Sequence, residues 1–166
     1  MCSSDLAVPA RRRTDDARPG PARYITMNAL DAEQARRFAL TWLPAWTGND
    51  PQRLAAFYSE DAFYLDPAVP QGLRGKPALL GYFERLLARN PAWVWTQVEG
   101  IPMQDGFLNK WCADIPVGGE VLTVVGVCLV QLDQAGKIRR NEVYFDRSEW
   151  MTRMGAASKR DRDGGP

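Results

Sequence analysis

The residues best placed to do chemistry lie at the end of a short apolar run, Ala62 to Asp66, which Pro67 stops. A carboxylate at a strand end facing an apolar cavity is a typical general base, and we expect that role for Asp66. Tyr64 shares its face of the strand, since side chains alternate with a period of two, and could donate to a substrate oxygen. The alternatives are that Asp66 only caps a turn before the proline and that Tyr64 is a packed core tyrosine.

Histidine is absent from all 166 residues, and this absence limits the chemistry more than any other feature of the composition. It excludes Ser-His-Asp and Cys-His catalysis. The three cysteines, Cys2, Cys112 and Cys128, have no metal-ligand spacing, so we expect no metal and no cofactor. Proton transfer must then use Asp, Glu, Tyr, Lys, Cys or water.

Tryptophans are unusually frequent for one small domain: Trp42, Trp46, Trp93, Trp95 and Trp111 all fall in patterned segments. Core packing accounts for some of them. A flat, aromatic-lined pocket for a polycyclic or terpenoid ligand would account for a surplus. The sequence leaves both interpretations open.

The elements that must position these residues form one predicted domain, residues 28–154, between a disordered N-terminal tail, 1–27, and a disordered C-terminal tail, 155–166. Met27 is a candidate natural start, in which case the preceding residues are an artefact. The net charge is +1, but the part between the tails carries 13 basic against 15 acidic residues, so the domain has no basic excess and we expect no nucleic-acid partner. The absence of a long apolar stretch argues against a membrane span, and free thiols without an export signal favour the cytoplasm.

Helices come first in the predicted order. One covers about residues 32–47, capped by Asp31 and kinked near its end by Pro44. A short one covers 51–58, and a third begins near Pro77 and ends at Asn90-Pro91, after a loop at Gly72 to Gly75. The strand containing Asp66 lies between the last two.

Strands make up the rest of the domain, over about 93–99, 107–115, 121–132 and 137–146, followed by a helical turn over 148–154. This order predicts an α+β fold in which helices pack on a curved antiparallel sheet whose concave side forms a cavity. Alternation from Cys128, expected to be an inert buried thiol, places two sets of residues on the inner face. They are Val124, Gly126 and Val130 on one strand and Asn141, Val143 and Phe145 on the next. Asn141 would be the main polar group of that wall.

Three segments carry a resemblance to a known family: Phe57 to Pro67, Gly72-x-x-Gly75, and Asp133 to Asp146. In order and spacing they resemble the nuclear transport factor 2-like superfamily, in particular its SnoaL-like branch, which is related to ketosteroid isomerases, polyketide cyclases and limonene-epoxide hydrolases. The resemblance implies a cone-shaped α+β barrel, with three N-terminal helices packed on a curved antiparallel sheet that encloses a pocket. It also implies a homodimer formed through the sheet.

Transferred residue by residue, the family's catalytic sets are incomplete here. Asp66 stands where ketosteroid isomerases have their proton-abstracting base, but their oxyanion donors fall on Trp42 and Cys128, which donate one indole N–H and a weak S–H. Limonene-epoxide hydrolases have an aspartate where this chain has Val143, and Asp114 could stand for their strand aspartate. The histidine of many SnoaL-type cyclases is absent.

We therefore predict a small-molecule pocket protein, with two functions open. It is a cofactor-free isomerase, cyclase or hydrolase using Asp66 as base, or a non-catalytic ligand-binding or dimerising domain. The predicted catalytic residues are Asp66, Tyr64 and Asp114. The predicted ligand-binding residues are Trp42, Trp46, Trp95, Trp111, Cys128, Asn141 and Val143.

Overall fold

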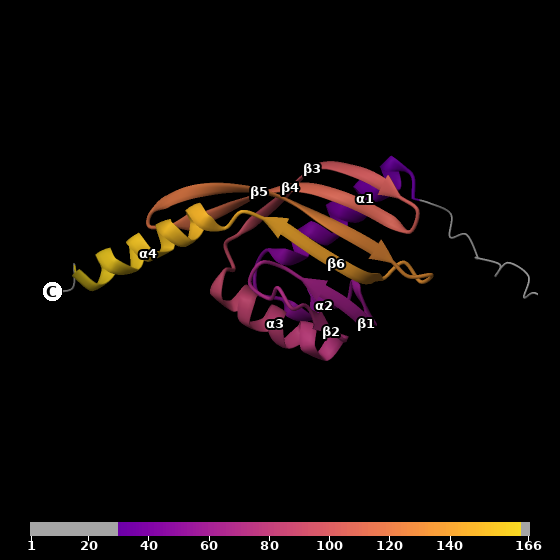
Figure 1. The fold of residues 1–166 in the computed structure, drawn as a ribbon, viewed down its shortest axis with the longest axis horizontal. Helices are drawn as coiled ribbons and strands as arrows, with labels where there is room; N and C mark the ends of the chain where they lie inside the picture. Colours follow the sequence, from indigo (N-terminus) through magenta and orange to yellow (C-terminus); the bar gives the residue numbers. More distant parts are fainter. Residues whose placement is uncertain (1–29, 164–166) are drawn as a thin grey trace, which may run out of the picture.

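The computed structural model of the chain describes residues 30–163. The predictions for the N-terminal tail, including Cys2 and Met27, lie outside the described residues. Figure 1 shows the elements, which run in this order: α1 (Ala32–Trp42), η1 (Leu43–Trp46), α2 (Pro51–Ala55), β1 (Tyr58–Leu65), β2 (Leu73–Arg74), α3 (Lys76–Arg89), β3 (Val94–Met103), β4 (Gly106–Val117), β5 (Glu120–Leu132), β6 (Ile138–Phe145) and α4 (Ser148–Asp163).

The first helix begins where the sequence predicts, but its α-helical part ends at Trp42 and not near residue 47. The Asp31 side chain accepts from the backbone N–H of Gln34 at 2.7 Å, and the Gln34 side chain accepts from the backbone N–H of Asp31, so the two form a capping box. Near Pro44 the α-helix gives way to the 3₁₀ turn η1. This turn places Trp42 and Trp46 on the same side of the chain, in contact with one another at 6.1 Å between ring centroids.

The sheet contains the predicted antiparallel meander of β3, β4, β5 and β6, and two further strands extend it. The strand order is β2-β1-β6-β5-β4-β3, and β1 pairs with β6 in parallel. Because β2 and β3 are both edges, the sheet curls without closing. Helix α1 contacts β3 and β4, and α3 contacts β1, so the helices cover one face of the sheet (Figure 1).

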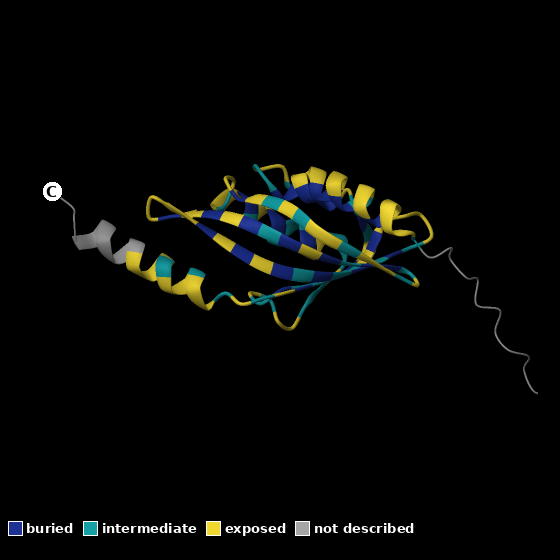
Figure 2. Cartoon of the chain, turned by 90° about the horizontal axis from the view of Figure 1, so that it is seen from above, coloured by how far each residue is buried: buried dark blue, intermediate teal, exposed yellow. Residues whose placement is uncertain are grey.

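Buried and exposed side chains alternate along β4, β5 and β6 (Figure 2). The predicted register is confirmed: Cys128 pairs with Val143, and Val130 pairs with Asn141. All four of these side chains are buried. The inner face of the sheet is therefore the one that the alternation predicts, and the site residues of β5 and β6 project from it.

Besides β3, which runs to Met103 and not to about residue 99, two boundaries differ from the prediction. Helix α2 ends at Ala55, and β1 begins already at Tyr58, because the backbone O of Phe57 accepts from the N–H of Ile138 at 2.8 Å and strand pairing with β6 starts there. The segment at Leu73–Arg74, predicted as loop, pairs with β1 as the short strand β2. Tertiary pairing overrides local preference in both places.

Helix α4 is longer than the single turn predicted for residues 148–154. It continues to Asp163, where the sequence predicts a disordered tail, and it leads away from the body of the molecule (Figure 1). The Asp146 side chain begins the helix by accepting from the backbone N–H of Ser148 at 2.8 Å.

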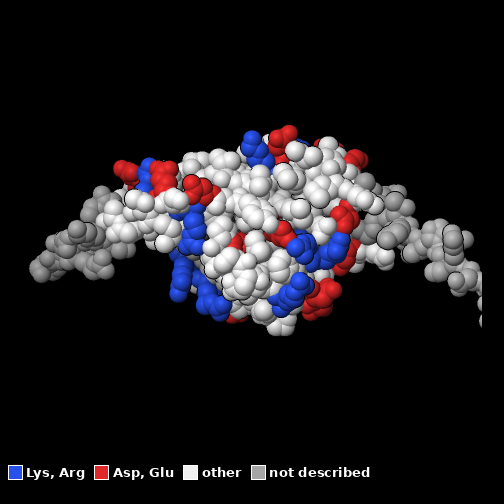
Figure 3. All heavy atoms as spheres, in the orientation of Figure 1, with Lys and Arg blue, Asp and Glu red and all other residues white. Residues whose placement is uncertain are grey.

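The described part of the chain, residues 30–163, contains no helix long and apolar enough to cross a membrane. On the face seen in Figure 3, basic and acidic side chains lie next to one another in several small groups around a broad uncharged area. The charge of this face is thus divided among small groups of both signs.

Candidate functional site

A pocket lies between the helices and the inner face of the sheet. The space open to the centre of a water molecule is about 60 Å³. The lining is aromatic and aliphatic apart from a few polar groups, chiefly Asp66, Asn141 and Arg147. Exposed Ala68 and half-buried Tyr82, Arg147 and Trp150 belong to the same lining, so the pocket reaches the surface on their side.

The structure brings nearly all of the predicted site residues together. Asp66, Tyr64 and the seven predicted ligand-binding residues line this one pocket: Trp42, Trp46, Trp95, Trp111, Cys128, Asn141 and Val143. Asp114 is the exception. It lies exposed on the outer face of the sheet, where its carboxylate accepts from the Thr123 hydroxyl at 2.7 Å, so it cannot act on a ligand in the pocket.

All six tryptophans of the chain line the pocket. They form a connected set, in which Trp46 contacts Trp95 at 6.0 Å, Trp95 contacts Trp111 at 4.8 Å and Trp93 contacts Trp150 at 5.2 Å between ring centroids. Most of these pairs are tilted or edge-to-face, the arrangement that aromatic quadrupoles favour. The tryptophans therefore both build the core and supply the wall of the pocket.

Asp66 follows the last residue of β1 and divides its two carboxylate oxygens between two tasks. Its Oδ1 accepts from the backbone N–H groups of Ala68 and Val69, at 2.6 and 3.1 Å, and so caps the turn after β1. Its Oδ2 accepts from the hydroxyl groups of Tyr64 at 2.8 Å and Tyr82 at 2.5 Å. The residue is 7% exposed and lines the pocket. Both predicted alternatives, turn cap and pocket acid, thus describe this one side chain.

The two tyrosines are held as neutral donors to that carboxylate. Burial, followed by the nearby charge of Asp66, raises the pKa of Tyr64 well above its ordinary value, and the same two causes raise the pKa of Tyr82. Both phenols therefore keep their protons at neutral pH. Tyr64 directs its proton to Asp66, and in this arrangement that proton is not available to a substrate oxygen.

Asn141 supplies a second polar group on the wall. It is directly beside Tyr64 in the pairing of β6 with β1, and its Nδ2 donates to the hydroxyl oxygen of Tyr58 at 3.0 Å. Burial raises the pKa of Tyr58, partly offset by Asn141. Tyr58, Tyr64, Tyr82, Asp66 and Asn141 thus form a polar strip carried by β1, β6, α3 and the turn after β1.

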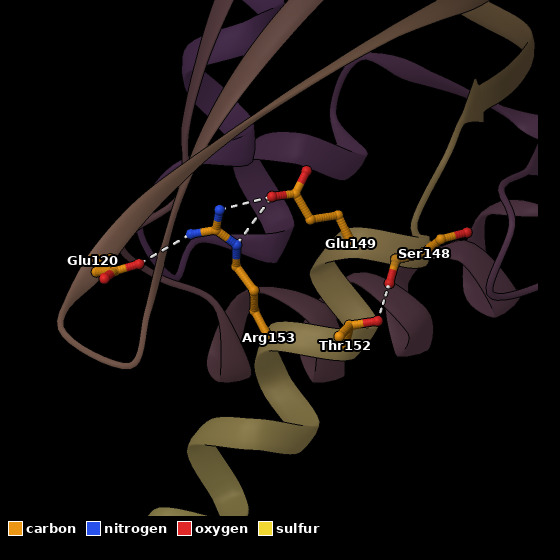
Figure 4. Close-up of polar contacts among 5 residues, drawn as sticks. All are labelled: Glu120, Ser148, Glu149, Thr152 and Arg153. Carbon is orange, nitrogen blue, oxygen red and sulfur yellow. Dashed lines mark hydrogen bonds and ion pairs between the residues drawn. The ribbon is translucent and has the colours of Figure 1, made fainter.

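Helix α4 closes one side of the pocket through its first turn. Trp150 packs edge-to-face on Trp93, and the Arg147 guanidinium donates to the backbone O of Pro67 at 3.1 Å and lies 5.4 Å from the Trp150 ring centroid. One turn later, Arg153 donates to Glu149 on the same helix and to Glu120 at the start of β5 (Figure 4). These contacts fix the start of α4 against the sheet.

The cysteine on the wall is chemically quiet. Burial raises the pKa of Cys128 to about 12, so the thiol stays protonated at neutral pH, as predicted for an inert buried cysteine. Within residues 30–156, where side chains are described, no three His, Cys, Asp or Glu side chains gather closely enough to hold a metal ion.

Comparison with known proteins places the fold. A family model for the SnoaL-like domain matches residues 39–141, well over half of the chain. The chain belongs to this family. No curated protein matches the sequence.

Solved structures agree with the SnoaL-like fold. A protein with a ketosteroid isomerase-like fold from Catenulispora acidiphila DSM 44928, in complex with trimethylamine, is 20% identical with a TM-score of 0.61, covering 70% of this chain and 91% of its own. A proposed isomerase of the SnoaL-like family from Agrobacterium tumefaciens is 20% identical with a TM-score of 0.58, covering 69% and 98%. A SnoaL-like protein of unknown function from Burkholderia thailandensis is 15% identical with a TM-score of 0.58, covering 70% and 98%. At these identities the likeness shows the fold alone.

The pocket residues of this SnoaL-like protein that sequence reasoning missed include Tyr82, Arg147 and Trp150. A signal for Tyr82 was present, because it lies three residues after Leu79 and four before Leu86, a spacing that puts it on the same side of a helix as these two leucines. No pattern in the sequence indicates that the start of α4 folds back onto the turn at Pro67.

Proposed function

We propose that this SnoaL-like protein is a cofactor-free enzyme of the isomerase, cyclase or hydrolase type, with Asp66 as the proton acceptor. The observation that carries the proposal is the carboxylate itself, almost fully buried on the wall of an aromatic pocket. Among the described residues it has no Lys or Arg partner within ion-pair distance, so only neutral donors balance its charge. Such a group is suited to take a proton from a bound molecule.

A proton acceptor needs a free lone pair, and all four acceptor positions of Asp66 are occupied. Tyr64 is buried within the core and the two backbone donors are fixed by the turn. Tyr82 is half-buried on α3, at the side where the pocket reaches the surface. We infer that a bound ligand displaces the Tyr82 hydroxyl. Asp66 Oδ2 then takes the proton of a C–H beside a carbonyl, or of a water, and returns it as the reaction ends.

The size of the pocket favours a small substrate over the polycyclic one that the tryptophans suggest. When the 60 Å³ open to the centre of a water molecule is treated as a sphere and enlarged by the radius of a water, the space has a molecular volume of roughly 200 Å³. That is below the ~300–1,000 Å³ of typical ligand pockets, and it suits an apolar molecule of about one or two rings.

The second candidate is a non-catalytic ligand-binding domain, and one observation favours it. Every lone pair of Asp66 is satisfied without a ligand, as expected of a structural carboxylate. Trp42 and Cys128, at the positions of the isomerase oxyanion donors, would also stabilise an enolate poorly.

Proton exchange separates the two functions. We would incubate the protein in D₂O with small cyclic ketones such as 2-tetralone and follow loss of the C–H signal beside the carbonyl by NMR. The enzyme should accelerate exchange over the buffer rate, and Asp66→Asn should abolish the acceleration while ligand binding persists. Asp114→Asn, on the outer face, is the matched control and should exchange like the wild type. Equal acceleration by Asp66→Asn would remove Asp66 from the mechanism.

We also propose a homodimer formed through the outer face of the sheet, in a cytoplasmic protein with free thiols. Support comes from apolar side chains exposed on that face: Val94, Val98, Val121, Val125 and Tyr144. Light scattering after gel filtration should give twice the chain mass. Val125→Lys should shift the protein toward the monomer, whereas Leu40→Lys, equally apolar and exposed but on α1, should not.

A further inference from the structure

Asn141 is a buried polar group whose hydrogen bonding is half complete. The residue is 0% exposed and lines the pocket from β6. Its Nδ2 donates to Tyr58, while its Oδ1 has no hydrogen-bond partner among the described residues. Buried polar atoms in folded proteins are almost always paired, so an unpaired carboxamide oxygen on a pocket wall indicates a place for a ligand atom.

The indole N–H of Trp42 is a second unpaired group in the same corner. Trp42 is 1% exposed, lines the pocket, and lies beside the hydroxyl of Tyr58, yet its Nε1 makes no hydrogen bond of acceptable geometry within the described part of the chain. The corner formed by Trp42, Tyr58 and Asn141 therefore presents one free donor and one free acceptor.

We propose that Asn141 determines specificity in this pocket by binding a hydroxyl group carried on an apolar ring, with Trp42 as the second partner. A hydroxyl donates to Asn141 Oδ1 and accepts from the Trp42 N–H at once. A ligand hydroxyl also suits the carboxamide of Asn141 turned by 180°, in which Tyr58 donates to Oδ1 and the ligand oxygen accepts from Nδ2. The ligand class is phenols and cyclic alcohols of one or two rings.

Other polar groups fit the corner less well. An ammonium group would donate to Asn141 but leave the Trp42 N–H unpaired. A carboxylate would satisfy Trp42 but face the carboxamide oxygen and add a second negative charge to a pocket that already holds Asp66. The inference rests on the proposed function only in that the pocket takes small ring molecules, and it does not require catalysis by Asp66.

Paired probes test the proposal on the unmodified protein. Binding of 2-naphthol and of 2-methylnaphthalene, in which a methyl group of similar size replaces the hydroxyl, would be measured by isothermal titration calorimetry. We expect 2-naphthol to bind about tenfold more tightly, the fold-change that corresponds to ~1.4 kcal/mol, or roughly one net hydrogen bond. Equal affinities, tighter binding of the methyl compound, or no binding of either up to its solubility would each overturn the inference.

Variants then assign the preference to a residue. Asn141→Leu should reduce the ratio of the two affinities to about one. Asn109→Leu is the matched control, because Asn109 is also 0% exposed with an unpaired Oδ1 but does not line the pocket, and it should keep the wild-type ratio. If Asn141→Leu folds poorly because Tyr58 loses its partner, Tyr58→Phe with Asn141→Leu removes both groups and should give the same ratio of one. If these variants kept the tenfold preference for 2-naphthol, Asn141 would not be the residue that determines it. The role of Asp66 is tested separately by proton exchange.

Discussion

Removing either phenol hydroxyl from Asp66 should reveal how much each stabilises the carboxylate. Tyr64→Phe and Tyr82→Phe each delete one O–H that donates to Oδ2 and leave the ring in place. A hydrogen bond to a charged group contributes about 1.5–3 kcal/mol in protein mutants. The two positions differ in burial: Tyr64 is 2% exposed, whereas Tyr82 is half-buried beside the mouth of the pocket.

This difference in burial sets the expected magnitudes. Tyr64 is almost fully buried, so after Tyr64→Phe water replaces the lost donor poorly and the free energy of unfolding should fall by about 2–3 kcal/mol. After Tyr82→Phe a water can enter from the open side and donate in place of the phenol, so the loss should be about 1 kcal/mol or less. If Asp66 is the catalytic base, Tyr82→Phe should also leave proton exchange intact or faster, because a lone pair of Oδ2 is no longer blocked.

Urea unfolding followed by tryptophan fluorescence provides the assay, because all six tryptophans report on the core around the pocket. Unchanged m-values would show that the variants differ in stability and not in the compactness of the unfolded chain. The reasoning is refuted if Tyr82→Phe costs as much as Tyr64→Phe, since that would mean that the Tyr82 hydroxyl is as inaccessible to water as the Tyr64 hydroxyl and cannot be the donor that a ligand displaces.

Three further predictions concern packing, pH and surface charge. Gly126→Ala would place a methyl group 2.4 Å from a ring carbon of Trp111, so urea unfolding should show a loss of about 2 kcal/mol or more. Burial raises the pKa of Tyr58 and of Tyr64 above that of an unfolded tyrosine. Above about pH 10 the unfolded chain therefore releases phenolic protons that the folded chain keeps, and each tyrosine should lower the free energy of unfolding by about 1.4 kcal/mol per pH unit, with no such loss below pH 10. Urea unfolding between pH 9 and 12 tests this slope. Arg153→Ala removes solvent-exposed ion pairs and should change stability by less than about 0.5 kcal/mol in the same assay.

The inner face of the sheet was predictable because buried residues alternate every two positions along β5 and most of β4, although the pairings of β3 with β4 and of β5 with β6 each contain a register shift. From Cys128 alone, the pattern places Asn141 and Val143 on the inner face, and the register of β5 with β6 confirms this. The boundary between α2 and β1 was not predictable in the same way. Whether residues near Phe57 continue a helix or begin a strand depends on β6, a partner about 80 residues away, and no local pattern encodes that pairing.

The hydrogen-bond partners of Asp66 show the same limit at the level of the site. Period two places Tyr64 beside Asp66 on one face, and the structure joins them at 2.8 Å. Tyr82 comes from a helix, and its distance from Asp66 depends on how α3 packs on β1. Helical spacing predicts that Tyr82 lies on the inner face of α3, but it does not predict that the Tyr82 hydroxyl contacts the Asp66 carboxylate. A sequence can therefore identify the acid in the pocket without identifying the donors that occupy its lone pairs.

Asp114 is the one predicted site residue that lies outside the pocket. Trp111 and Asp114 are three residues apart on one strand, so alternation puts them on opposite faces, and only one of them can line the pocket. Both were predicted as site residues, Asp114 from the resemblance to epoxide hydrolases, and the structure places Trp111 on the inner face and Asp114 exposed on the outer face. The polar groups of this pocket consequently come from β1, β6, α3, the turn after β1 and Arg147 just before α4, and its one carboxylate, Asp66, does not come from β4. A ligand that hydrogen-bonds to this polar strip would meet the tryptophans of the same lining with its apolar part, so the register that puts Trp111 inside and Asp114 outside also sets which groups a ligand meets.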